Sequence, residues 1–159
     1  MAAEKIKIKQ DLNDILAELK AEGKVIGFTN GCFDILHLGH IRYMASAKAA
    51  CDVLVVGVNS DGSVKRLKGD SRPVNTLEAR MGVLSAVESI DYVVAFEEDT
   101  PVNLIETFVP DVLFKGGDWN EEDVVGGDIV KANNGKVMII KFEEGYSTTE
   151  VIEKIKKEK

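Results

Sequence analysis

The stretch "DVLVVGVNS", Asp52–Ser60, is the clearest strand in the sequence and indicates the fold. Its valine and leucine residues are almost continuous, whereas a strand with one face in water alternates apolar and polar residues. Such a composition is typical of a strand in a parallel sheet that is covered on both faces. The sequence therefore predicts a parallel sheet between two layers of helices.

Further strands and helices alternate on both sides of this stretch. Strands are predicted at 25–29, 92–97, 111–117 and 136–142, and helices at 11–23, 40–50, 75–89, 101–109, 128–135 and 147–159. Alternating strands and helices predict right-handed crossovers. We expect an α/β fold, a Rossmann-like parallel five-stranded sheet with helices on both faces.

Two helix starts carry capping signals. Asn75 is a plausible N-cap residue, with Glu78 three positions later in a capping-box pattern. Ser147 or Thr148 is the expected cap of the last helix.

The composition is that of a globular domain with an acidic balance. The chain has 45% hydrophobic and 30% charged residues and a formal net charge of −7, which argues against general nucleic-acid binding. The sequence shows neither a signal peptide nor an apolar run near the roughly 20 residues of a membrane span, so we expect a cytoplasmic protein without membrane contact. Cys32 and Cys51 lack a C-x-x-C spacing and are expected to be free thiols.

One short segment is basic despite the acidic balance. "VKRLKGDSR", Val64–Arg72, holds four of the twenty lysine and arginine residues. A solvated surface loop is the simplest interpretation of such a charge run, although a local group of cations also suits a phosphate compound.

Polar segments follow all five predicted strands. They are "TNGCFD" (29–34), "NSDGS" (59–63), "FEED" (96–99), "KGGDW" (115–119) and "EEGYSTT" (143–149). Parallel strands bring their carboxyl ends to one edge of a sheet, where α/β folds bind ligands. The sequence therefore predicts a site built from these segments.

His37 and His40, the only histidines, follow the first of these segments. A zinc site with Cys32 and Asp34 is one interpretation, but these ligands crowd one turn and lack a second cluster. Simple packing is another. A phosphate cradle is favoured because Gly39 lets a ligand approach the backbone and the following helix offers its positive N-terminal end. The chain contains no G-x-x-x-x-G-K-[ST] and no G-x-G-x-x-G pattern.

These segments resemble a known family. "TNGCFDILHLGH" (29–40) resembles the H-x-G-H signature of the cytidylyltransferase-like nucleotidyltransferases, and "YSTT" (146–149) resembles their second signature, I-S-T-T. The stretches "VNSDGSVKRLKG", "RPVNTLEARM", "EEDTPVNLIE" and "FKGGDW" are similar to those of bacterial D-glycero-β-D-manno-heptose 1-phosphate adenylyltransferases, which occur alone or as the second half of a bifunctional kinase fusion. This likeness extends from about residue 25 to residue 155.

The resemblance implies transfer of AMP from ATP to heptose 1-phosphate, giving ADP-heptose and pyrophosphate for the lipopolysaccharide core. It implies catalytic roles for His37, His40 and Lys68. It implies nucleotide binding by Thr29, Asn30, Gly31, Cys32, Phe33, Asp34, Gly39, Arg80, Gly117, Asp118, Ser147, Thr148 and Thr149. It implies substrate binding by Asn59, Asp61, Lys65, Lys115 and Trp119.

Several of these roles have a simpler alternative. Arg80 would form a surface ion pair with Glu78 or Glu88, a common pairing on helices. Lys65 and Lys68 would be ordinary loop charges, and Trp119 would pack on the core instead of stacking on a base or sugar. Capping alone would account for the S-T-T hydroxyl groups.

The resemblance also implies the cofactor and partners. Mg²⁺ is expected to arrive with ATP, so no protein metal site is predicted. We expect a single domain over residues 1–159, with residues 1–23 as a helical extension and residues 24–155 as the catalytic core, and a homodimer. Phe142 stands where glycerol-phosphate cytidylyltransferases carry an arginine, which favours the adenylyl branch. A glycerol-3-phosphate cytidylyltransferase, an FMN adenylyltransferase and a catalytically silent nucleotide-binding protein remain the alternatives.

Overall fold

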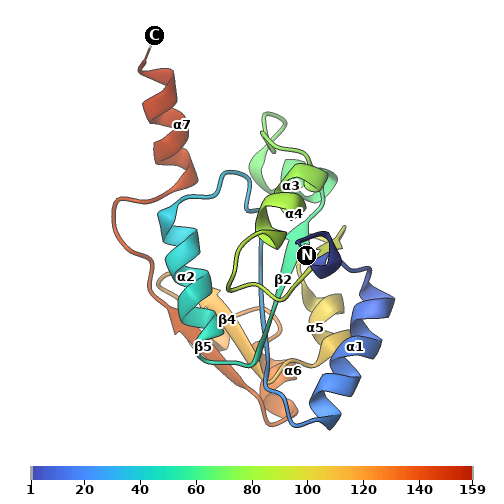
Figure 1. Cartoon of the computed structure of the whole chain (residues 1–159). Helices are drawn as coiled ribbons and strands as arrows, with labels where there is room; N and C mark the ends of the chain where they lie inside the picture. The colour runs from blue at the N-terminus through green and yellow to red at the C-terminus, as the bar shows by residue number, and fades with distance from the viewer. Residues whose placement is uncertain (1, 159) are drawn as a thin grey trace.

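The five strands lie parallel in the order β3-β2-β1-β4-β5, as a computed structural model that describes residues 2–158 shows (Figure 1). The strands are β1 Ile26–Gly31, β2 Val53–Asn59, β3 Tyr92–Phe96, β4 Val112–Gly116 and β5 Lys136–Ile140. The Rossmann-like prediction is confirmed. All seven residues of β2 are buried, as its continuous apolar composition predicts.

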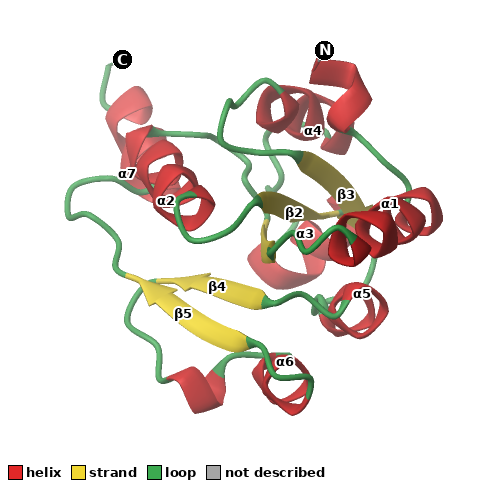
Figure 2. Ribbon diagram, turned by 60° about the horizontal axis from the view of Figure 1, so that its bottom comes forward, coloured by secondary structure: helices red, strands yellow, loops and turns green. Residues whose placement is uncertain are grey.

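Helices cover both faces of this sheet (Figure 2). They are η1 Ala2–Lys5, α1 Lys9–Ala21, α2 Leu38–Lys48, α3 Asp61–Lys68, α4 Leu77–Ser85, α5 Val102–Phe108, η2 Glu121–Asp123, α6 Gly127–Ala132 and α7 Thr148–Lys156. Side chains from α1, α5 and α6 share one apolar cluster with the sheet, and side chains from α2 and α4 share the other.

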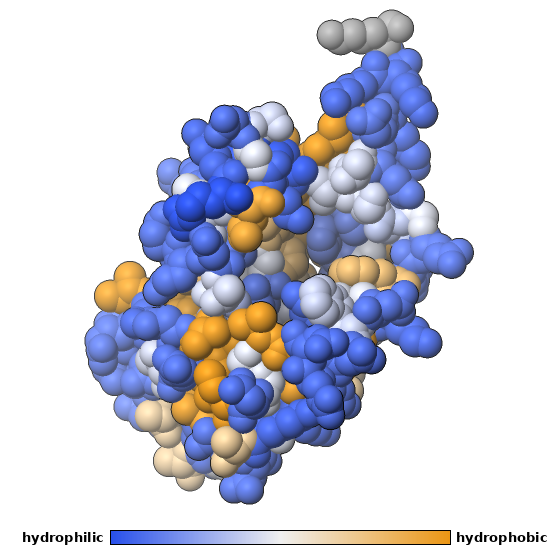
Figure 3. Space-filling view, turned by 180° about the vertical axis from the view of Figure 1, so that it is seen from behind, coloured by the Kyte–Doolittle hydropathy of each residue, from blue (hydrophilic) through white to orange (hydrophobic). Residues whose placement is uncertain are grey.

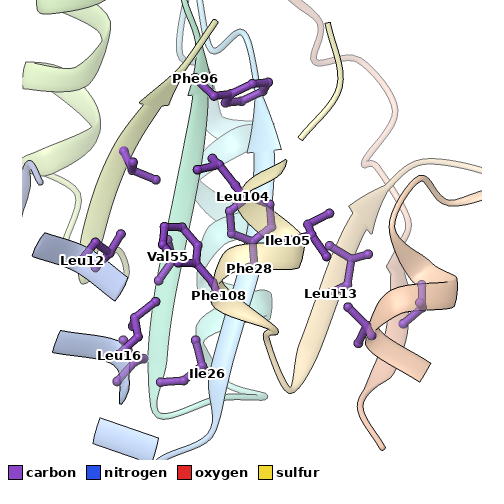
Figure 4. Packing of buried hydrophobic residues seen from close by; sticks show 14 of the residues in the cluster. Leu12, Leu16, Ile26, Phe28, Val55, Phe96, Leu104, Ile105, Phe108 and Leu113 are labelled. Carbon is purple, nitrogen blue, oxygen red and sulfur yellow. The ribbon is translucent and has the colours of Figure 1, made fainter. Parts of the chain in front are cut away.

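The first cluster centres on Phe28 of β1, whose ring lies 6.4 Å from that of Phe108 on α5 (Figure 4). Leu12 and Leu16, four residues apart on α1, pack onto the same face of the sheet. Their burial explains the amphipathic spacing of this helix. β2 contributes residues to both clusters and β1 contributes to the first, so both strands are anchored in the core.

The N-terminal extension packs on the domain. Ile6 forms a parallel bridge with Val93 of β3, and the Lys5 ammonium group donates hydrogen bonds to the carbonyls of Val87 and Ile90 at 3.1 and 2.6 Å. The segment before α1 therefore covers the start of the edge strand β3 and the turn before it.

The basic segment is wrong as a predicted loop, because most of it lies in α3. The Ser60 hydroxyl accepts a hydrogen bond from the amide of Ser63 at 3.1 Å and caps this helix. Arg66 then pairs with Asp99 at 2.7 Å and donates to the carbonyl of Glu97. Acidic residues after β3 compensate part of the charge that made the segment look like a solvated loop.

One of the two helix N-caps predicted from the sequence is confirmed. Ser147 caps α7 by accepting a hydrogen bond from the Glu150 amide at 3.0 Å, which confirms the first of the two expected caps. The prediction of Asn75 as the N-cap of α4 is wrong, because Thr76 holds that position. The backbone and side-chain amides of Asn75 bind Asp34 instead.

The face in Figure 3 is largely hydrophilic, with apolar residues gathered mainly in its lower half. α7 stands away from the body in Figure 1, and none of its residues is buried. No helix within residues 2–158 is long and apolar enough to cross a bilayer.

Candidate active site

A cleft of about 650 Å³ opens at the carboxyl edge of the sheet. Its walls come from the ends of β1, β2 and β4, from α3, from the segment before α5 and from the start of α7. The segments that follow β1, β2, β3 and β4 all contribute residues, as the rule for parallel sheets predicts. Residues 29–34 line the cleft without a break.

Thr29 fixes the end of β1 from below. Its hydroxyl lies 2.8 Å from the phenol of Tyr43 on α2, and both side chains are buried. Burial raises the pKa of Tyr43 to about 12, against the opposing effect of this hydrogen bond, so the phenol stays neutral. The bond ties the strand to the helix that carries the histidines.

His40 lies in the first turn of α2 and faces the cleft. Its Nδ1 accepts a hydrogen bond from the backbone amide of His37 at 3.3 Å. Burial, with a smaller contribution from His37, lowers the pKa of His40 to about 4. The ring is therefore neutral near pH 7, and since Nδ1 is the acceptor, Nε2 carries the proton and serves as a donor.

His37 occupies the N-cap position of α2 and stacks on His40, with ring centroids 3.9 Å apart. Its Nδ1 is buried without a hydrogen-bond partner among residues 2–158, and burial lowers the pKa of His37. A Cβ atom on Gly39 would lie 3.0 Å from the His37 ring and from the Tyr146 Cβ. Gly39 therefore makes room for these two side chains beside the cleft.

Asp34 is the most heavily bonded acid of the cleft. Its fully buried carboxylate accepts hydrogen bonds from Arg72 at 2.7 Å and from the amides of Val74 and Asn75 at 2.8 Å. Burial alone would raise the pKa of Asp34, but the two amides and the guanidinium outweigh it and lower the pKa. Asp34 thus joins the end of β1 to the segment before α4.

Arg80 is buried below the cleft, with 2% of its surface exposed. Its guanidinium donates to the carbonyls of Cys32 and Asn59 at 2.7 and 2.8 Å, and to the Asp61 carboxylate at 2.8 Å. The alternative of a surface ion pair with Glu78 or Glu88 is therefore wrong. Arg80 fastens the carboxyl ends of β1 and β2 together, and it is not among the residues that line the cleft.

Two lysines supply positive charge on the opposite side. Lys68 at the end of α3 and Lys115 on β4 both line the cleft. Burial, and then the nearby charge of Lys68, lowers the pKa of Lys115. The Lys115 ammonium lies 4.7 Å from the centre of the Trp119 ring, which is 48% exposed and not packed into the core.

The remaining wall comes from the segment that follows β5 and from the start of α7. Thr148 and Thr149 line the cleft at the start of α7, and the Thr148 hydroxyl donates to the carbonyl of Ile35 at 3.3 Å. Phe142 lies across the end of β4, where a Cβ atom on Gly116 would come within 2.5 Å of its ring. An aromatic ring therefore lies at the position where glycerol-phosphate cytidylyltransferases carry an arginine.

The structure brings together most of the residues assigned from the sequence. Thirteen line the cleft: Thr29, Asn30, Gly31, Cys32, Phe33, Asp34, His40, Asn59, Lys68, Lys115, Trp119, Thr148 and Thr149. The others are not among the lining residues: His37, Gly39, Asp61, Lys65, Arg80, Gly117, Asp118 and Ser147. Gly117 and Asp118 line a shallower neighbouring hollow with Trp119.

Several lining residues carry no assignment from the sequence. Arg72 and Tyr43 are polar, and Leu67, Val124 and Val125 supply apolar surface. In the sequence, Arg72 is one charge of the basic segment and the first residue of the stretch "RPVNTLEARM", and neither pattern assigns it a role. Its proximity to Asp34 depends on a segment that folds back over 38 residues of chain.

The donor groups of the cleft do not form a resident metal site. No group of three or more histidine, cysteine, aspartate or glutamate side chains within residues 2–158 is placed to hold a metal ion. Of the four residues of the zinc alternative, Asp34 is committed to Arg72 and two amides, and His40 Nδ1 to a backbone amide. Burial also raises the pKa of the Cys32 thiol, which disfavours the thiolate form that binds metals.

The comparisons with known proteins identify the class as a nucleotidyltransferase, and the Rossmann-like fold and the cationic cleft agree with it. Residues 28–154 match the family described as cytidylyltransferase-like, and the chain belongs to this family.

Curated relatives are similar over almost the whole chain. The bifunctional protein HldE of Salmonella dublin and that of Salmonella arizonae are each 53% identical over 150 residues, which is 94% of this chain and 31% of each relative. The chain thus spans about a third of the length of these relatives.

Solved structures share the fold. The lipopolysaccharide core biosynthesis protein of Thermoplasma volcanium aligns with a TM-score of 0.63 and 28% identity, covering 79% of this chain and all of the other. The pantoate-β-alanine ligase of Francisella tularensis aligns with a TM-score of 0.62 at 16% identity, covering 95% of this chain and 76% of the other. The second likeness concerns the fold alone.

Proposed function

We propose that the protein transfers AMP from ATP to D-glycero-β-D-manno-heptose 1-phosphate, giving ADP-heptose and pyrophosphate. One observation carries the reaction type: a neutral His40 donor lies at the N-terminal end of α2, in the same cleft as Lys68 and Lys115. This arrangement suits a site that holds several phosphate groups and stabilises the charge that moves between them. The acceptor rests on the sequence resemblance and on the identity with part of the bifunctional relatives.

The reaction requires no protein nucleophile. An oxygen of the sugar phosphate attacks the α-phosphorus of ATP, and the bond from that phosphorus to the bridging oxygen breaks. The electron pair of the broken bond leaves with pyrophosphate. Because the attacking oxygen is already anionic, the chain's task is to align the two phosphates and to stabilise the transferring group.

The residues divide this task. His40 and His37 would donate hydrogen bonds to the phosphates beside α2, and the backbone of residues 29–34 would cradle the triphosphate. Lys68 and Lys115 would hold the leaving pyrophosphate or the sugar phosphate from the opposite side. Thr148 and Thr149 would bind phosphate oxygens at the N-terminus of α7.

The cleft also fits Mg²⁺ that arrives with ATP. Asp34 and Asp99 are the carboxylates that line it within residues 2–158, and each is paired with an arginine. Mg²⁺ would therefore be bound by phosphate oxygens and water, where it would neutralise charge on the triphosphate.

The aromatic end of the cleft supports an adenine nucleotide. Phe142 and Trp119 both border Gly117, whose added Cβ would lie 3.3 Å from Phe142 and 3.5 Å from Trp119. These rings offer a flat apolar surface for a base, and Phe142 replaces the guanidinium of the cytidylyl branch.

Pyrophosphate release tests this function. The purified protein would be assayed with ATP or CTP against heptose 1-phosphate, glycerol 3-phosphate and FMN, with Mg²⁺ and with EDTA. We expect turnover with ATP, heptose 1-phosphate and Mg²⁺. Turnover of ATP only with another acceptor would overturn the heptose assignment, and ATP binding without any turnover would favour a silent binding protein. Light scattering of the same sample tests the predicted homodimer.

A further inference from the structure

The two arginines near Asp34 differ in how their nitrogens are used. Arg80 donates from its Nε and from both terminal nitrogens to protein groups, and it is buried. Arg72 donates only its Nε, to Asp34 at 2.7 Å, and its side chain is 19% exposed and lines the cleft. Its two terminal nitrogens have no hydrogen bond within residues 2–158. Arg72 is thus the arginine with donors left for a ligand.

Asp34 holds Arg72 from behind. The carboxylate is fully buried and also accepts the amides of Val74 and Asn75, so it cannot turn away from the segment that carries Arg72. An arginine fixed through Nε keeps its outer edge in a constant direction. Such an edge matches two oxygens of a phosphate group.

The charges in the cleft favour an anion at this position. Lys68, Lys115 and Arg72 line it, whereas its acids are Asp34 and Asp99, each paired with an arginine. Within residues 2–158, no unpaired carboxylate of the cleft competes for the Arg72 amino groups. A phosphate bound there would complete the hydrogen bonds of the guanidinium.

We propose that Arg72 is a phosphate-binding residue of the active site and that Asp34 is the positioning residue that presents it. The two terminal nitrogens of Arg72 bind oxygens of a substrate phosphate, and Arg80 holds the strand ends together. This inference rests on the proposed function for the nature of the substrates. The bound group is either the β,γ-phosphate part of ATP, which leaves as pyrophosphate, or the phosphate of the acceptor.

Arg72→Gln tests the proposal, with Lys131→Gln as its control. Both variants lose one positive charge and one ion pair. Lys131 lies on α6, outside the cleft, and its ammonium group pairs with the Glu121 carboxylate at 3.4 Å. Calorimetry would measure the binding of ATP, inorganic pyrophosphate and inorganic phosphate, and the pyrophosphate-release assay would give KM for each substrate. Thermal unfolding would verify that both variants fold.

We expect Arg72→Gln to weaken binding of one phosphate ligand about tenfold to a hundredfold, the usual effect of losing hydrogen bonds to a charged group. Weaker ATP and pyrophosphate binding places Arg72 on the nucleotide, and weaker inorganic phosphate binding with a higher acceptor KM places it on the acceptor. Arg72→Lys should recover little of the lost affinity for the phosphate ligand, because one amine cannot bond Asp34 and a phosphate in the same fork geometry. Added guanidinium ion at millimolar concentration should partly restore the binding of the phosphate ligand to the Arg72→Ala variant.

An Arg72→Gln variant that matches Lys131→Gln in every binding constant and every KM would overturn the proposal. The binding measurements keep it separate from the proposed reaction. If the wild-type protein binds ATP and pyrophosphate but does not turn over heptose 1-phosphate, the acceptor is wrong and Arg72 is still judged by binding. If the wild-type protein binds none of the three phosphate ligands, both proposals fail.

Discussion

The two walls of the cleft are built differently. On the side of β1, β2 and α4, the Asp34 carboxylate and the Arg80 guanidinium are buried and bonded to groups from several elements. On the side of β5 and α7, Phe142 is 60% exposed and no residue of α7 is buried. The first wall forms together with the core, whereas the second has few contacts that hold it.

This difference separates stability from adaptability. A wall with buried, fully bonded charges opens only when the domain unfolds, because breaking its bonds leaves charges without partners. A wall held by exposed contacts changes its position at low cost. We therefore expect substitutions in the first wall to affect the whole domain and substitutions in the second to act locally.

The largest effect is expected for Asp34→Asn. Loss of the charge leaves Arg72 unpaired and sets an amide group against the amides of Val74 and Asn75. The free energy of unfolding should fall by about 3–5 kcal/mol, as for other broken buried ion pairs. Denaturant unfolding measures it, and Asp52→Asn, where an exposed carboxylate accepts the Val25 amide, should cost about 1 kcal/mol or less. Equal losses in the two variants would contradict the comparison.

His40→Ala should affect the reaction far more than the fold. Loss of one donor to the transferring phosphate should cost about 3 kcal/mol of transition-state stabilisation, a few hundredfold in rate. The unfolding free energy should change much less than in Asp34→Asn, since the side chain lies at the cleft surface. Steady-state kinetics and denaturant unfolding of the same sample check both parts. Wild-type turnover would remove His40 from the reaction.

A change of pH should alter the free energy of unfolding less than Asp34→Asn does, and it should act in two separate pH ranges. Burial sets the pKa of His40 at about 4 against an ordinary 6.5, so the unfolded chain binds a proton that the folded protein does not. Stability should therefore decline as the pH falls from about 6.5 to about 4. The lowered pKa of Asp34 has its effect further down, where stability present above about 3.8 is lost.

Variants assign these windows. Unfolding free energies between pH 7 and pH 3 should show a shallower decline in His40→Gln in the upper window alone. An unchanged upper slope in this variant would mean that His40 is not the group that titrates there.

Ser147→Ala should have the smallest effect. Its hydroxyl caps α7 by accepting the Glu150 amide, and loss of such a cap costs about 1 kcal/mol of helix stability. Because α7 buries no residue, hydrogen exchange should speed up in α7 while global unfolding stays within about 0.5 kcal/mol of wild type. Thr76→Ala, the matched cap of α4, should lower global stability instead. A global loss in Ser147→Ala would show that both walls unfold as one unit.

The sequence predicts what depends on local pattern. Asp52–Ser60 is apolar throughout and forms the central buried strand β2, and the polar segments after the strands meet because parallel strands point the same way. The turn that carries His37 and His40 follows the end of β1 and opens α2, as the alternation of strands and helices predicts.

What the sequence does not predict depends on distant partners. The resemblance implies a nucleotide contact for Arg80, yet the residue is buried and donates to the carbonyls of Cys32 and Asn59, 48 and 21 positions away. The charges of α3 favoured the prediction of a solvated loop, because the acidic partner of Arg66 lies after β3, far away in the sequence. Arg72 belongs to the family-like stretch "RPVNTLEARM", but its place in the cleft depends on the buried Asp34, 38 positions away.

The bridge between Ile6 and Val93 has a consequence for how the protein behaves in concentrated solution. An uncovered edge strand offers a row of unpaired backbone groups that invites another chain to add a strand. Ile6 occupies that position at Val93 of β3, and the Lys5 ammonium group binds the carbonyls of Val87 and Ile90 just before the strand. A shortened protein that starts at Lys9 would expose this edge, so it should self-associate and precipitate even where its cleft is intact.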